Sequence, residues 1–231
     1  MRSALAPRVL SGTAGPRTIR PLALFAAVAL LAALWSGPFS PFGPLGTGPA
    51  TFTGHMILHM GIVAVAAPLL VLALPALPRA LDRIAPPVIA APLAAVVEFV
   101  VVWGWHTPAM CGLAQTSLAA FAAEQASWLV VGLFLWAAVL RPATASGLAL
   151  WAGVLALLVT GMHMTLLGTL ITLATHPQYG RPLIDQQVGG LIMLAVGAVA
   201  YTGAGLALAL RGLSERAEDA GPVHWRKDPE R

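Results

Sequence analysis

Charged residues are scarce in this sequence. Only 10% of its 231 residues are Asp, Glu, Lys or Arg, whereas soluble globular domains carry about 25%. Hydrophobic residues make up 58% of the chain, and the mean hydropathy is +0.81. This balance excludes an ordinary soluble domain and predicts a membrane protein in contact with the lipid bilayer.

Cysteine is almost absent as well, since Cys111 is the only one. Neither an intrachain disulfide nor a Cys-x-x-Cys metal or redox motif can therefore form. Basic residues lie at the ends of apolar segments rather than in a stripe with interleaved aromatics, so we expect no nucleic-acid partner despite a pI near 10.2. The sequence shows no nucleophile–base arrangement and no phosphate-binding glycine loop, and we do not expect an enzyme.

Long apolar runs are what the sequence has in abundance. They lie at 20–36, 52–74, 88–105, 119–140, 148–172 and 187–210. Most reach the roughly 20 residues that a bilayer-spanning helix needs, which predicts an all-α, polytopic membrane helix bundle with about six transmembrane helices. The bundle is expected over residues 20–211, between an N-terminal segment, 1–19, and a C-terminal tail, 212–231.

The first apolar run has two interpretations. It is short and follows a basic stretch, as in a cleaved signal peptide. No convincing small-residue cleavage site comes after it, however. A retained first helix is therefore the interpretation that we favour.

The basic residues predict the orientation of the bundle. All of them except Arg181 fall before the first run, between the second and third, between the fourth and fifth, or after the sixth. Cytoplasmic loops carry the excess of Lys and Arg in membrane proteins. These segments, and with them both termini, are predicted to be cytoplasmic.

Two stretches combine histidine with methionine. In "TGHMILHM", His55 and His59 are four residues apart and share one helix face, while Met56 and Met60 share the adjacent face. The combination returns in "GMHM", which ends at Met164 on another predicted helix. Thioether and imidazole donors together suit Cu(I) better than zinc, calcium or magnesium.

The predicted topology brings these residues to one side of the membrane. The helix with His55 starts at the outer face, the next helix ends there at His106, the following one starts there near Glu124, and His163 lies in the outer half of the fifth. The sequence thus predicts a Cu(I) site near the outer face. Its candidate ligands are His55, Met56, His59, Met60, His106, Glu124, His163 and Met164.

Other interpretations stay open at this point. Histidines on facing helices, such as His59 and His163, could instead hold haem. A copper transporter would need polar groups along its whole path, and the inner halves of the predicted helices hold almost none. A scaffold without metal is a further alternative. For Glu98, a carboxyl that bonds a neighbouring helix is the simplest role.

Five motifs together identify a family resemblance. They are "HMILHMGIVAVAAPLLVLALP", "WGWHTPAM", "EQASWLVVGLFLW", "LLGTLITLATHPQYG" and "DQQVGGLIM". In this order they resemble the CtaG family of membrane-embedded cytochrome c oxidase assembly factors, first associated with caa-type oxidases. The resemblance covers residues 50–210.

The resemblance implies a multi-pass protein of the bacterial inner membrane with a role in respiratory chain biogenesis. It would assist the assembly of a haem–copper cytochrome c oxidase, at the stage of copper insertion from the outer face. The implied partners are cytochrome c oxidase subunits and other copper chaperones. The positions that fall on the family's motifs are His55, His59, Met60, His106, Glu124, Asp185 and Gln186.

Overall fold

The computed structural model describes residues 16–42, 51–140 and 147–219, and within these ranges every regular element is a helix. The helices are α1 (Pro16–Ser36), α2 (Phe52–Met60), η1 (Gly61–Ala66), α3 (Ala67–Ala73), α4 (Ala76–Ile84), α5 (Pro87–Trp105), α6 (Pro108–Thr116), α7 (Leu118–Val139), α8 (Gly147–Thr172), α9 (Leu183–Gly197), η2 (Ala198–Thr202) and α10 (Gly203–Asp219). The elements η1 and η2 are π-helical, with five-residue rather than four-residue hydrogen-bond spacing.

Six helices in these ranges are long and apolar enough to cross a membrane. They are Ile19–Ser36, Phe52–Ala73, Pro87–Trp105, Leu118–Val139, Gly147–Thr172 and Leu183–Ala217. The second joins α2, η1 and α3, and the sixth joins α9, η2 and α10. The predicted all-α bundle of six transmembrane helices is confirmed. The last helix runs on to Asp219, past the boundary at 211 that the composition suggested.

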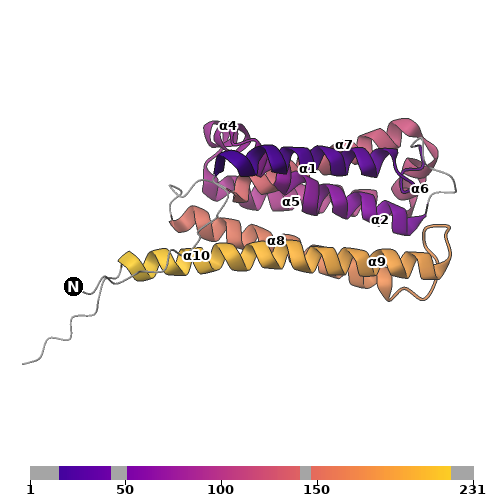
Figure 1. The fold of residues 1–231 in the computed structure, drawn as a ribbon. Coiled ribbons are helices and arrows are strands. Elements are labelled where there is room, and N and C mark those ends of the chain that lie inside the picture. The colour runs from indigo at the N-terminus through magenta and orange to yellow at the C-terminus, as the bar shows by residue number, and fades with distance from the viewer. Residues whose placement is uncertain (1–15, 43–50, 141–146, 220–231) are drawn as a thin grey trace, which may run out of the picture.

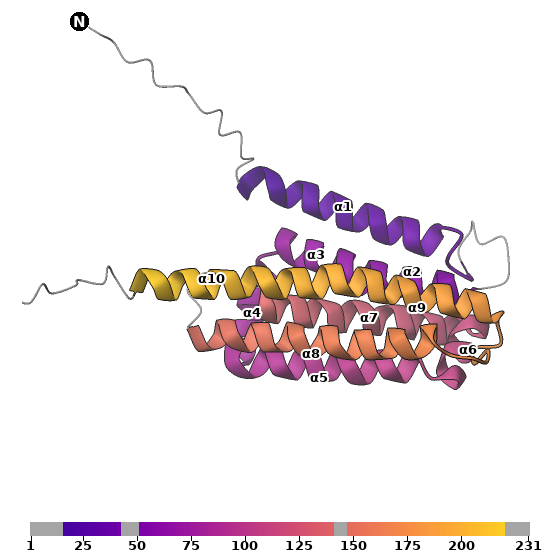
Figure 2. The ribbon, with the colours of Figure 1, turned by 90° about the horizontal axis from the view of Figure 1, so that it is seen from below.

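The long helices lie side by side, with the short helix α6 at one end of the bundle and α4 at the other (Figure 1). Helix α1 covers one side, next to α3 (Figure 2). Its residues Leu31 and Leu34 are buried in the common core.

The two ends of the bundle differ in the number of arginines. Arg79 and Arg83 belong to α4, and Arg211 and Arg216 belong to α10. Arg181 lies at the other end, which we call the α6 end, in the connection between α8 and α9. Arg141, also used to predict the orientation, lies outside the described residues.

A proline explains the π-helical segment η1. In π-helical pairing the N–H of residue 68 would bond the carbonyl of Val63, five residues earlier, but Pro68 has no N–H. Trp136 of α7 supplies the missing donor, because its indole N–H donates to the Val63 carbonyl over 2.7 Å. A carbonyl left unpaired inside a membrane bundle costs several kcal/mol, so this bond fixes α7 against the kinked second span.

We predict that Trp136→Phe lowers the free energy of unfolding by about 1–3 kcal/mol, since a buried acceptor loses its donor. Thermal unfolding in detergent would measure the loss. Trp103→Phe is the matched control, because the Trp103 indole N–H has no hydrogen-bond partner among the described residues. Equal melting temperatures for the two variants would contradict this account.

Candidate metal centre

Asp185 fixes the start of α2. Its two carboxylate oxygens accept the backbone N–H groups of Phe52 and Thr53 over 2.7 and 3.0 Å, and the Thr53 hydroxyl donates back to the Asp185 carbonyl. A carboxylate is stabilised at a helix N-terminus by the unpaired N–H groups and by the helix dipole. Because both oxygens are used, Asp185 has a structural role that its motif position did not reveal.

The contact between α2 and α9 is also close. A side-chain carbon at Gly189 would lie within 2.6 Å of the Phe52 ring, so only glycine permits this approach. Gln186 is fully buried and holds the preceding loop: it accepts from the Gln178 N–H and donates to the Ile171 carbonyl. The second motif residue is therefore structural as well, and together these contacts set the depth of His55 and His59.

Three histidine rings from two helices meet beside Trp128. The ring centroids of His55 and His59 on α2 lie 5.0 and 4.9 Å from that of His106, which follows α5. Both α2 rings also contact Trp128 of α7, at 5.0 and 4.7 Å. We call these residues, with His163, the histidine cluster.

His163 of α8 comes from a third direction. Its ring packs edge-on against Phe99 of α5. At a rise of 1.5 Å per residue, His59 lies about 10 Å along α2 from Phe52, and His163 about 14 Å along α8 from Thr172. The two residues are thus at similar depths below the α6 end.

The four rings are buried, yet they have free nitrogens. At most 6% of any of them is exposed. Within the described residues, His55 Nε2, His106 Nε2 and both ring nitrogens of His59 and His163 have no hydrogen-bond partner. Buried polar atoms are nearly always paired in folded proteins. An unpaired set of this size at one place is typical of a site built for a ligand.

The hydrogen bond of His106 shows which of its ring nitrogens is free to bind a ligand. Its Nδ1 lies 2.6 Å from the Val102 carbonyl. A carbonyl can only accept, so Nδ1 carries the proton and Nε2 keeps its lone pair. Metal-ligating histidines are commonly oriented in this way.

Glu124 adds a carboxylate to the cluster. One oxygen, Oε1, lies 3.5 Å from His55 Nδ1 and forms no hydrogen bond with a described residue. The other, Oε2, accepts from the Gln125 amide over 3.1 Å, and the Trp35 indole of α1 donates to the Gln125 carbonyl oxygen over 3.2 Å. The contacts of Trp35, Gln125 and Trp128 could not be predicted from the sequence, because nothing in their local pattern shows which helices meet.

The methionine side chains of α2 pack against a different helix from its histidines. Met56 lies beside Gly189 of α9, and Met60 and Met164 both lie beside Gly197. The thioethers therefore pack towards α9, while the imidazoles of His55 and His59 pack towards α5 and α7. The two donor types of α2 occupy adjacent faces, and these faces contact different helices.

The donors are not arranged as a finished metal site. In the described part of the chain, no group of three or more His, Cys, Asp or Glu side chains has the arrangement of a metal centre. The rings of His55 and His59 both pack against that of His106.

Two other ionisable residues, Glu98 and Cys111, lie outside the histidine cluster. Glu98 accepts hydrogen bonds from Thr160 and Tyr201, one on each oxygen, so its carboxyl links three helices. Cys111 is buried in α6 and accepts from Gln115. Burial raises the pKa of its thiol to about 12, so the thiol stays protonated at neutral pH.

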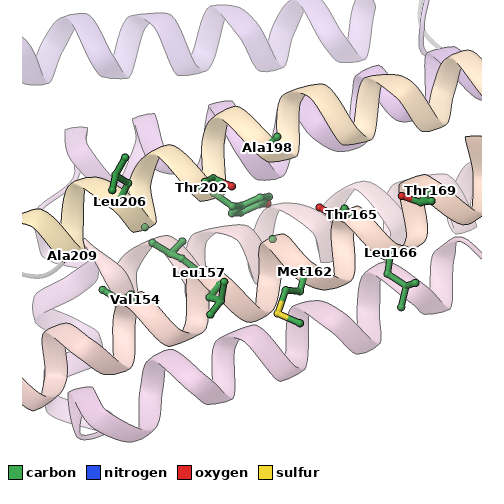
Figure 3. Close-up of a pocket in the computed structure, with 14 residues that line it drawn as sticks. Val154, Leu157, Met162, Thr165, Leu166, Thr169, Ala198, Thr202, Leu206 and Ala209 are labelled. Carbon is green, nitrogen blue, oxygen red and sulfur yellow. The ribbon is translucent and has the colours of Figure 1, made fainter.

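Two hollows of the described structure bear on the site. A small cavity of about 10 Å³ lies at the α6 end, between the segment after α1 and helices α2, α6 and α7, and it reaches His55 and Glu124. A larger groove of about 680 Å³ runs between α8 and the η2–α10 segment, and its lining is apolar apart from threonines and Tyr201 (Figure 3). Only the small cavity reaches the histidine cluster.

We predict that Asp185→Asn lowers the free energy of unfolding by about 1–2 kcal/mol, because the charge at the α2 N-terminus is lost. The folded variant should still bind as much metal as the wild type. Glu215→Gln is the matched control, because Glu215 pairs with Arg211 at the surface, where such pairs contribute little. Loss of metal without loss of stability would instead make Asp185 a ligand.

Comparison with known proteins identifies one family. The model of the family described as cytochrome c oxidase caa3 assembly factor (Caa3_CtaG) matches residues 5–215, which confirms the family resemblance of the motifs. No curated protein and no solved structure matches the chain.

Proposed function

Because the chain belongs to the family of cytochrome c oxidase caa3 assembly factors, we propose that it delivers copper to the oxidase from the outer face of a bacterial inner membrane. The observation that carries this proposal is the histidine cluster, where four buried imidazoles keep unpaired ring nitrogens. Copper is cargo in this proposal, received at the α6 end and passed on to an oxidase subunit.

The chemistry of the donors supports Cu(I). Imidazole and thioether are the soft donors available, and the cluster has both types within one bundle. A buried charge needs a nearby opposite charge. Glu124 supplies one carboxylate beside His55. Its single negative charge would neutralise a monovalent ion but only half of the charge of a divalent ion.

The incomplete arrangement supports transfer rather than storage. A donor set that is not already arranged as a metal centre holds its ion less firmly than a finished site. A carrier has to release its cargo, so a loosely organised donor set fits the proposed role.

The geometry gives less support to the other interpretations. The centroids of His59, His106 and Trp128 lie within 4.7 to 6.2 Å of one another, and the adjoining cavity of about 10 Å³ is far too small for a haem macrocycle. That cavity lies at the α6 end, which supports access from one side over passage across the membrane.

We predict that His59→Ala lowers Cu(I) affinity about tenfold or more and reduces oxidase assembly in cells at unchanged protein level. Met60→Leu keeps an apolar side chain of similar size and removes the sulfur, so a smaller loss would isolate the thioether contribution. Competition with a chromophoric Cu(I) chelator and oxidase activity in complemented deletion cells would measure the two effects.

The matched control is His176→Ala, an exposed histidine in the loop at the same end. It should leave both readouts unchanged. If purified wild-type protein takes up no Cu(I) under reducing conditions, the copper role is wrong and a scaffold without metal replaces it.

We predict that the α6 end faces outwards and that both termini are cytoplasmic. Gly112 and Ser214 are exposed at opposite ends of the bundle, so each can carry a single cysteine on a Cys111→Ala background. A membrane-impermeant maleimide should label Gly112→Cys in intact spheroplasts and Ser214→Cys only after the membrane is opened. The reverse pattern would overturn the orientation and, with it, the outer-face site.

A further inference from the structure

The small cavity at the α6 end connects the exterior of the bundle with the histidine cluster. We infer that it is the route by which a soft monovalent cation reaches the cluster, and that Glu124 is the first group to bind the ion there. The inference rests on the proposed function and adds to it a route and a first binding group. The residues that line the cavity and matter here are Phe39, His55, Ala114, Gln115, Phe121 and Glu124.

Glu124 is placed to receive a cation. It is 1% exposed and lines the cavity, and its Oε1 has no hydrogen-bond partner among the described side chains and backbone groups. His55 Nδ1 lies 3.5 Å from that oxygen, so an ion bound at Glu124 is already next to the first imidazole. His55 in turn contacts His106, which contacts His59. The cavity therefore leads to a sequence of donors rather than to an isolated carboxylate.

Two further residues hold Glu124 in this position. Gln125 follows it in α7 and donates to its Oε2, and Trp35 of α1 donates to Gln125. These bonds occupy Oε2 of Glu124 and leave Oε1 for the ion. Trp35 and Gln125 are thus positioning residues, and α1 contributes to the site although it provides no ligand.

The size of the cavity restricts what can pass. A volume of about 10 Å³ is close to the minimum that holds one water molecule. A single ion fits, whereas a ligand-bound complex does not, so the ion must leave its previous ligands at the mouth. Gln115 on the wall is fixed by hydrogen bonds from Arg181 and to Cys111, which keeps this wall in place.

The groove of Figure 3 is the competing route. It opens between α8 and the η2–α10 segment and is lined mainly by apolar side chains. An ion arriving there would meet Tyr201, whose hydroxyl already donates to Glu98. The groove offers no carboxylate and no imidazole on its surface, so the physical argument favours the α6 end.

Ala114→Leu tests the route, because it fills the cavity without replacing a proposed ligand. We expect Cu(I) uptake by the purified full-length protein to slow about tenfold, since the added volume must displace packed neighbours, while the final copper content stays at the wild-type level. Stopped-flow absorbance with bathocuproine disulfonate as the Cu(I) donor would follow the uptake. Gly112→Leu, on the same helix but facing open space, should load at the wild-type rate.

Two further variants keep the test decisive. Phe39→Ala shortens a side chain that is 40% exposed at the mouth, so it should speed uptake even where Ala114→Leu does not fold. Gly161→Leu narrows the groove of Figure 3 and should leave the rate unchanged. Slower uptake in Gly161→Leu, or unchanged rates in both cavity variants, would overturn the route. Failure of the proposed function is distinct, because then the wild type itself takes up no copper.

Discussion

A polar group inside a membrane bundle has no water to bind, so it must find its partner within the protein. Most of the fold follows from this constraint. The Val63 carbonyl, left without a donor by Pro68, takes the Trp136 indole. The unpaired N–H groups at the start of α2 take the Asp185 carboxylate. Each such bond joins two helices, so the need to pair polar groups also sets how the spans pack and at which depth the histidines lie.

Within the described residues, most of the buried side-chain atoms that lack a hydrogen-bond partner lie in the histidine cluster. His59 and His163 have no partner for either ring nitrogen within the described residues, although both rings are buried. His106 is paired on one nitrogen only. Elsewhere in the bundle, the Val63 carbonyl, the start of α2 and both oxygens of Glu98 all have hydrogen-bond partners. Imidazoles that lack partners at one depth are therefore best explained by a ligand from outside the chain.

The architecture could be predicted well because the lengths of the apolar runs and the positions of the arginines can be read directly from the sequence. The six spans came from apolar runs, and the ends of the first five agree closely with the helices, whereas the sixth helix begins earlier and ends later than its run. The depth of His55, His59, His106 and His163 followed from the same topology. The sequence also marked Asp185 and Gln186 as important, but not as structural residues, because hydrogen bonds between distant segments leave no local pattern.

What the sequence could not supply is which helix face meets which neighbour. Spacing placed Met56 and Met60 next to His55 and His59, but the thioethers pack beside glycines of α9 while the imidazoles pack beside Trp128. The division has a consequence for transfer. On the proposed route, an ion that enters past Glu124 would meet the imidazoles on the α5 and α7 side before it met sulfur on the α9 side. A carboxylate binds Cu(I) more weakly than the softer donors do, so this order of donors would favour movement of the ion from the cavity towards the cluster.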